Sequence, residues 1–255
     1  MNYRHITFAT ALICTALTSP VMIAPVLAGE PRAVIELFTS QGCSSCPPAD
    51  RLLGELAQDP SLLTMTLAVD YWDYLGWKDT LANRGHTSRQ QAYAKSRGDR
   101  NVYTPQVVVN GLVHVLGSDK AAIENAIAQT RRADAPFNLP VTITVADGKV
   151  TVNVDAANGA HQSGEVWLCP ITSKAPVAIG RGENHGRTLT YTNVVRRWVK
   201  LGDWNGKPAT FSMPVAELPA ADYSLKDIDW LATFVQSGVA AKPGLMLGAA
   251  TASLR

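Results

Sequence analysis

The chain has 255 residues, and its 23 lysines and arginines nearly balance its 21 aspartates and glutamates, for a formal net charge of +2. A balanced composition without a basic stripe or a block of like charges argues against nucleic-acid binding and against a disordered tail. Four cysteines in a chain of this length are too few for a disulfide scaffold. A hydrophobic core must therefore stabilise the fold.

Residues 1–28 have the pattern of a cleaved secretory signal peptide. A short polar start that carries Arg4 precedes a long apolar run, and the run ends in Val26-Leu27-Ala28, with a small residue at the cleavage position. An uncleaved membrane anchor is the alternative, but Pro25 and the cleavage-like end argue against it. We expect a periplasmic or secreted mature protein without a membrane span, in which three cysteines remain: Cys43, Cys46 and Cys169.

The most informative stretch is a pair of cysteines between an apolar run and a helix. The β-prone run from Val34 ends near Gly42, Cys43 and Cys46 follow, and a helix is predicted over 47–57. A thiol at a helix N-terminus faces unpaired N–H groups and the positive end of the helix dipole, which favour the thiolate. Cys43 is therefore the candidate nucleophile and Cys46 the candidate resolving cysteine, while Asp50 complements the dipole.

A second strand is predicted over 61–69, where the sequence is almost continuously apolar. Strand, helix and strand imply a right-handed crossover and a parallel pair, which brings the end of this strand to the sheet edge that carries Cys43. Asp70 is then a possible proton acceptor, and Trp72 a possible wall of the site. An alternative remains open, in which Asp70 caps a strand or helix and Trp72 fills the core.

Residues 71–101 are predicted to form a helical insert over the site, with a helix from about 88 to 96. Within this insert His86 is either a proton shuttle or simply solvated. Two β-prone runs joined by Asn110-Gly111 then predict a hairpin over 102–116, and a helix follows over 119–132.

Beyond a linker at 133–139 the hydrophobic period changes to two, which predicts a domain of many short strands over 136–255. Its Cys169 is either a buried apolar residue or a partner for the cysteine pair. The Gly180–Gly186 segment is glycine-rich but fits no phosphate-binding pattern, so a turn or bulge is favoured. Glu183 and His185 alone are too few to predict a metal site.

The first half resembles the thioredoxin superfamily in its Cys-x-x-Cys at a helix start, in Thr104-Pro105 opening the hairpin, and in its final helix. The resemblance implies a cis Thr104–Pro105 bond beside Cys43, and backbone there that meets an extended substrate segment. Thr104 and Pro105 are thus expected to bind the substrate, and we add Trp72 as the possible wall of the site.

A closer similarity covers nearly the whole mature chain. The segments 36–50, 69–73 and 180–184 are similar to those of secreted bacterial proteins of domain of unknown function 1223. That resemblance implies an exported thioredoxin-like protein. The expected architecture is an α/β thioredoxin-like N-terminal domain over 29–135, followed by a mostly-β, sandwich-like domain over 136–255.

The expected function is that of an exported thiol–disulfide oxidoreductase with no cofactor and no metal, acting on protein thiols or disulfides in the cell envelope. The alternative is a non-enzymatic binding module in which Cys43–Cys46 is a permanent disulfide. A chaperone for a soft metal such as copper or zinc is a third interpretation, and it lacks a second ligand pair.

Overall fold

The computed structural model describes Met1 and residues 31–132, 137–157 and 163–254. Apart from Met1, the expected signal peptide at 1–28 lies outside the described residues. The expected domain boundary between residues 135 and 136 also lies outside them.

Strand β1 (Ala33–Thr39) is buried along its whole length, because both of its faces are covered. Its odd-numbered residues contact the apolar faces of α1 (Pro47–Leu56) and α3 (Lys120–Arg132), and its even-numbered apolar residues belong to a second cluster on the opposite face. β1 pairs in parallel with β2 (Leu62–Ala68), and α1 connects the two strands. This strand–helix–strand order confirms the local prediction and explains why both strands are mainly apolar.

The other neighbour of β1 is a hairpin. β3 (Gln106–Val109) runs antiparallel to β1 and pairs with β4 (Val113–Leu116), and Asn110-Gly111 between them has positive φ at both residues, as a hairpin of this type requires. Before the hairpin, a short 3-10 turn (Asp73–Leu75) and helix α2 (Arg84–Arg97) occupy the expected insert. α2 begins four residues earlier than predicted, because the side chain of Asn83 caps the N–H of Gly85.

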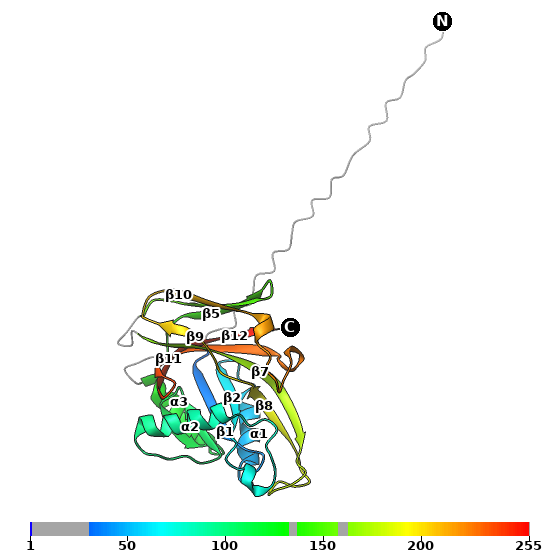
Figure 1. Cartoon of the computed structure of the whole chain (residues 1–255). Coiled ribbons are helices and arrows are strands. Elements are labelled where there is room, and N and C mark those ends of the chain that lie inside the picture. Colours follow the sequence, from blue (N-terminus) through cyan, green and yellow to red (C-terminus); the bar gives the residue numbers. More distant parts are fainter. Residues whose placement is uncertain (2–30, 133–136, 158–162, 255) are drawn as a thin grey trace.

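Strands from the second half extend the same sheet. These are β7 (Gly164–Ala178), β8 (Thr188–Val195), β9 (Val199–Trp204), β11 (Trp230–Val239) and β12 (Lys242–Ser253). β8 lies beside β2, so the sheet follows the order β12-β11-β7-β8-β2-β1-β3-β4, with β9 pairing on β7. Figure 1 shows the strands of both halves side by side in this sheet.

The prediction of an α/β thioredoxin-like N-terminal domain followed by a sandwich-like β domain is wrong. Within the described residues the chain is mostly β, with twelve strands and three α-helices, and β1 to β4 belong to a mixed sheet of nine strands that both halves build. The cluster on the even-numbered face of β1 shows the physical reason. It joins Phe38 and Met65 from the first half to Ile171, Phe234 and Met246 from the second.

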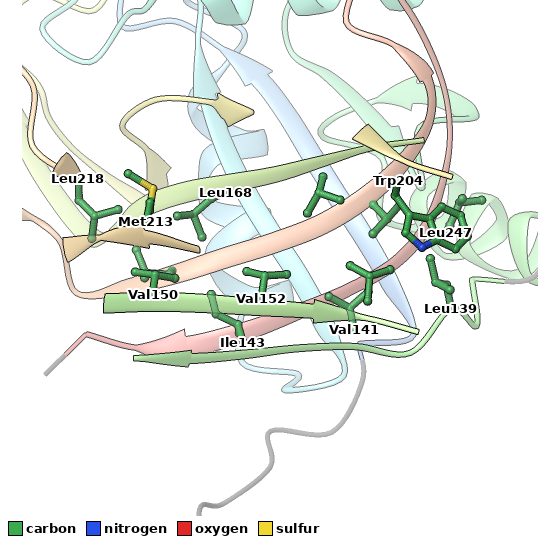
Figure 2. Close-up of a cluster of buried hydrophobic side chains, with 14 of the residues drawn as sticks. Leu139, Val141, Ile143, Val150, Val152, Leu168, Trp204, Met213, Leu218 and Leu247 are labelled. Atoms are coloured by element: carbon green, nitrogen blue, oxygen red, sulfur yellow. The ribbon is translucent and has the colours of Figure 1, made fainter. Parts of the chain in front are cut away.

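A second, smaller sheet covers part of the large one. β5 (Val141–Ala146), β6 (Lys149–Val154) and β10 (Ala209–Pro214) form three antiparallel strands, and 3-10 turns follow at Val215–Glu217 and Leu225–Asp227. Figure 1 shows this sheet as an outer layer next to β9 and β12, at the end of the molecule opposite the helices. Alternating residues of the small sheet, such as Val150 and Val152, pack on Leu168, Trp204 and Leu247 (Figure 2).

A buried ion pair also connects the two halves. The guanidinium of Arg89 on α2 donates to Glu36 of β1 at 2.6 Å and to Gln236 of β11 at 2.9 Å, and the hydroxyl of Tyr93 donates to Glu36 at 2.6 Å. The Arg89 guanidinium also lies 3.9 Å from the ring centre of Trp198. Full hydrogen bonding is what makes a charge at this depth tolerable. No helix in the described part of the chain is both long and apolar enough to cross a membrane.

Candidate functional site

Cys43 and Cys46 form a disulfide at the start of α1, with Cα atoms 5.4 Å apart. Cys46 is the N-cap residue of the helix, and its carbonyl oxygen accepts the N–H groups of Ala49 and Asp50 at 2.9 and 3.1 Å. Pro47 and Pro48 in the first turn have no N–H, so the helix dipole is the feature of α1 that favours negative charge at the pair. Both cysteines are completely buried, whereas Ser44 and Ser45 between them are exposed. The structure therefore shows an oxidised pair that is shielded from solvent.

The cis bond that the resemblance predicted between Thr104 and Pro105 is present. The sulfur of Cys43 lies 3.8 Å from the carbonyl oxygen of Thr104. The indole N–H of Trp72 donates to the hydroxyl of Thr104 at 2.8 Å, and a Cβ added to Gly42 would lie only 3.0 Å from the Cβ of Trp72. The fold thus gathers Trp72 and the Thr104–Pro105 peptide around Cys43.

Asp70 occupies the end of β2 but is bonded to α2. The Thr87 hydroxyl donates to its carboxylate at 2.5 Å and accepts from its backbone N–H at 3.2 Å. The side chain is half-buried. Asp70 thereby ties the strand end to the helix, and its role as a proton acceptor stays a prediction.

A different carboxyl group lies in the interior beside the cysteine pair. Asp50 is one helical turn after Cys46, so the two side chains share a face of α1. Burial raises the pKa of Asp50 to about 7, although its Oδ1 accepts a hydrogen bond of 2.7 Å from Thr39. Its Oδ2 has no hydrogen-bond partner among the described residues. Asp50 can therefore change protonation state near neutral pH.

Asp79 is a second buried carboxyl group in the same neighbourhood. It accepts backbone hydrogen bonds from Gln41 at 2.7 Å and from Leu81 at 2.8 Å, and burial raises its pKa to about 6. Its negative charge further raises the pKa of Asp50. Burial raises the pKa of Tyr191 on β8, and the negative charges of Asp50 and Asp79 raise it further. Its buried hydroxyl has no hydrogen-bond partner among the described residues.

Sequence reasoning missed the roles of Asp50 and Asp79. Asp50 was interpreted only as a charge that complements the helix dipole. Its spacing of four from Cys46, on the apolar face of a short helix, could have indicated a buried carboxyl group on the side of the cysteine pair. Asp79 lies in an irregular segment, and no local pattern could have placed it under Gln41.

The loop between β7 and β8 completes the site from the second half of the chain. The side-chain amide of Asn184 donates to the carbonyl oxygens of Gln41 and Cys43, both at 2.9 Å. Glu183 accepts the backbone N–H of Ser44 at 3.0 Å. The segment that sequence analysis interpreted as a turn therefore binds the backbone of the cysteine loop.

Comparisons with known proteins identify the family. The family model described as "Protein of unknown function (DUF1223)" matches residues 34–236. The chain belongs to this family. A crystal structure of a protein from Agrobacterium tumefaciens is similar to this DUF1223 chain, with 31% identity and a TM-score of 0.75, over 87% of this chain and 93% of that one.

HBP35 of Porphyromonas gingivalis is a more distant match. It has 14% identity and a TM-score of 0.56, over 88% of the DUF1223 chain and 76% of its own, so this likeness concerns the fold alone. Among curated proteins, none matches the chain.

Two other candidates from the sequence are buried in the DUF1223 fold. The His86 side chain bonds the carbonyl oxygen of Ala68 at 2.9 Å, and burial lowers its pKa to about 4, so the ring is neutral near pH 7. Cys169 is a free thiol inside the core shared by both halves, and burial raises its pKa. Within the described residues, His, Cys, Asp and Glu side chains do not gather in threes as a metal site would require.

Proposed function

We propose that this protein is an exported thiol–disulfide oxidoreductase, with Cys43 as the nucleophile and Cys46 as the resolving cysteine. The pair lies at the N-terminus of α1, where the positive end of the helix dipole favours a thiolate. The carbonyl oxygen of Thr104 and the ring of Trp72 border Cys43, and we assign them, with Pro105, to contact the substrate segment.

Asp50 is the observation that carries this proposal. A permanent disulfide needs no titratable group beside it, and a buried carboxyl with an unbonded oxygen costs stability. A resolving thiol, in contrast, needs a base to remove its proton. Asp50 lies one turn from Cys46 and titrates near neutral pH, which suits that task.

The proposed exchange moves two electrons from the dithiol to a partner disulfide. The Cys43 thiolate attacks one partner sulfur, the partner S–S bond breaks, and a partner thiolate leaves while a mixed disulfide forms. The Cys46 thiol gives its proton to the Asp50 carboxylate and attacks the sulfur of Cys43, which re-forms the Cys43–Cys46 bond and expels the second partner thiolate. One partner thiolate takes a proton from solvent and the other takes the proton held by Asp50. The reverse sequence oxidises a partner dithiol.

The proposed partners are protein thiols or disulfides of the bacterial cell envelope. The signal-like pattern of residues 1–28 supports a periplasmic or secreted location. In an exported chain with so few cysteines, a Cys-x-x-Cys pair suggests disulfide exchange more than structural stabilisation.

Burial of the cysteine pair supports a second candidate function, a binding module with a structural disulfide. Both cysteines are inaccessible in the oxidised state, and the Asn184 loop bonds the backbone around them. This candidate expects the Cys43→Ser/Cys46→Ser double variant to retain its function.

Trapping of partners tests the proposal. The full chain is expressed with its own leader and with Cys169→Ala, and Cys46→Ala is compared with Cys43→Ala/Cys46→Ala. We expect mixed disulfides to accumulate only when Cys43 is present and Cys46 is absent, because the trapped adduct then has no resolving thiol. A reductant should cleave these adducts. An adduct pattern that is the same in both variants would refute the exchange mechanism.

The reduction potential of the pair separates the two candidates independently of any partner. Equilibration with glutathione followed by thiol alkylation and mass spectrometry gives the ratio of dithiol to disulfide. A potential between about −120 and −270 mV places the pair among exchange catalysts. A potential below about −300 mV indicates a structural disulfide and favours the binding module.

A further inference from the structure

The loop between β7 and β8, residues Gly180–Gly186, is here called the strap. It begins after Ala178 and returns at Thr188, so it belongs wholly to the second half of the chain. Its tip nevertheless reaches the cysteine loop between β1 and α1. Asn184, which is completely buried, makes two hydrogen bonds of 2.9 Å there, to the carbonyl oxygens of Gln41 and Cys43.

The orientation of the Asn184 amide is fixed by a third bond. Arg187 donates to Asn184 Oδ1 at 2.9 Å, which leaves only the NH₂ group to face the cysteine loop. The carbonyl oxygen of Cys43 also accepts the N–H of Cys46 at 3.2 Å, within the cysteine loop. Asn184 adds a second donor to that oxygen and a donor to the carbonyl oxygen of the buried Gln41, and so it holds the loop from the strap.

Glu183 adds a negative charge at the same place. Its carboxylate accepts the N–H of Ser44 at 3.0 Å, the residue directly after Cys43, and this bond lowers the pKa of Glu183 from its usual value. Because Pro47 and Pro48 have no N–H, the helix dipole and the N–H groups of the cysteine loop are what can stabilise a Cys43 thiolate. Glu183 occupies one N–H beside Cys43, and its negative charge would oppose a negative charge on the Cys43 sulfur.

We propose that the strap sets the redox properties of the Cys43–Cys46 pair, with Asn184 holding the cysteine loop and Glu183 opposing the Cys43 thiolate. Both are positioning residues, because they act through the backbone and through charge. The inference deepens the proposed function and rests on it. Since a less stable thiolate makes the dithiol a better reductant, the strap makes the disulfide less oxidising than the helix N-terminus alone would make it.

Glu183→Gln tests the charge with the geometry unchanged, because the Gln oxygen can still accept the N–H of Ser44. The matched control is Glu124→Gln, on the exposed side of α3. In equilibrium with glutathione we expect the dithiol-to-disulfide ratio of Glu183→Gln to rise about two- to fivefold at low salt, as for other charges near a helix N-terminus. The pH midpoint of Cys43 alkylation should fall in the same variant, and the control should match the parent chain.

Salt and a double variant distinguish the charge from a structural effect. One molar NaCl should remove most of the Glu183→Gln effect, since the carboxylate is exposed and screening is strong there. Asn184→Ala releases the strap, and we expect it to raise the same ratio and to make Glu183→Gln silent when the two are combined. Unchanged ratios in Glu183→Gln, a shift of opposite sign, or additive effects in the double variant would overturn the inference.

These measurements need no partner protein, so they are independent of the trapping experiment. If trapping fails while Glu183→Gln shifts the glutathione equilibrium, the exchange function is wrong and the control of the disulfide by the strap is right. If trapping succeeds and the equilibrium does not move, the exchange function stands and the role of the strap is refuted.

Discussion

Asp50→Asn should stabilise the folded protein, and increasingly so as the pH rises. In the oxidised fold the pKa of Asp50 is raised from 3.8 to about 7, chiefly by burial. Between these two values the folded chain holds a proton that the unfolded chain has lost, so the free energy of unfolding falls as pH rises. Each unit of pKa difference corresponds to about 1.4 kcal/mol, which gives a loss of about 4 kcal/mol from Asp50 above pH 7.

Asparagine at position 50 keeps the acceptor for Thr39 and never ionises. We therefore expect Asp50→Asn and the parent chain to have similar unfolding free energies near pH 4 and to differ by about 2–4 kcal/mol at pH 8. Asp79 and Tyr191 face the same group, and Asp79 shifts the stability in the same direction as Asp50. Buried His86 has the opposite effect, because its lowered pKa removes stability as the pH falls below 6.5.

Comparison of the variant with the parent at each pH cancels the contribution of His86. Urea unfolding of the oxidised proteins from pH 4 to 8 measures the difference, and Asp155→Asn, an exposed position, is the matched control. A difference between Asp50→Asn and the parent that stays constant over this range would refute the assignment of a raised pKa to Asp50.

Four further predictions follow from the same contacts. Asp50→Asn should slow closure of the Cys43–Cys46 bond from a mixed disulfide with glutathione about 100-fold at pH 7, as measured by stopped-flow mixing, while an unchanged rate would exclude Asp50 as the base. A fragment of residues 31–132 should show no cooperative thermal transition by circular dichroism, because the core of β1 and β2 needs Ile171 and Phe234 from the other half; a cooperative transition would contradict the shared sheet. Gly111→Ala should lower the free energy of unfolding, measured in urea, by about 2 kcal/mol or more. Its φ is +73°, and an added Cβ would collide with the carbonyl oxygen of Gly244. A smaller loss would contradict that packing. Arg89→Met should cost about 3–5 kcal/mol by leaving Glu36 buried without its cation, and Glu36→Gln/Arg89→Met should recover much of the loss; if it does not, the ion pair is not the cause.

Local features of the first half were predictable because each rests on neighbouring residues. Pro47 and Pro48 mark the start of α1, and Asn110-Gly111 marks the hairpin, so the elements follow from turn and cap chemistry alone. The disulfide needs only Cys43 and Cys46 at their spacing.

The arrangement of the halves was not predictable in the same way, because it depends on one long-range strand pair. β2 and β8 meet in parallel at Thr66 and Val194, which lie 128 positions apart in the numbering. The faces of β2 are buried whichever strand pairs along its edge. The sequence of β2 therefore does not indicate which strand is its partner. The prediction of an α/β thioredoxin-like fold for the first half failed at this pair. The position of Asp79 near the cysteine pair was not predicted for a similar reason, since its partner Gln41 is distant in sequence.

The shared sheet gives the second half a direct part in the cysteine site. β8 follows the strap without interruption, so the strand that pairs with β2 also determines where Asn184 meets the cysteine loop. The same strand carries Tyr191 to the pair of buried carboxyl groups. A change that shifts β8 relative to β2 would therefore move the strap and the polar group near Asp50 together. Under the proposed role of the strap, the β-rich half acts on the cysteine pair through Asn184 and Glu183, whose positions β8 determines.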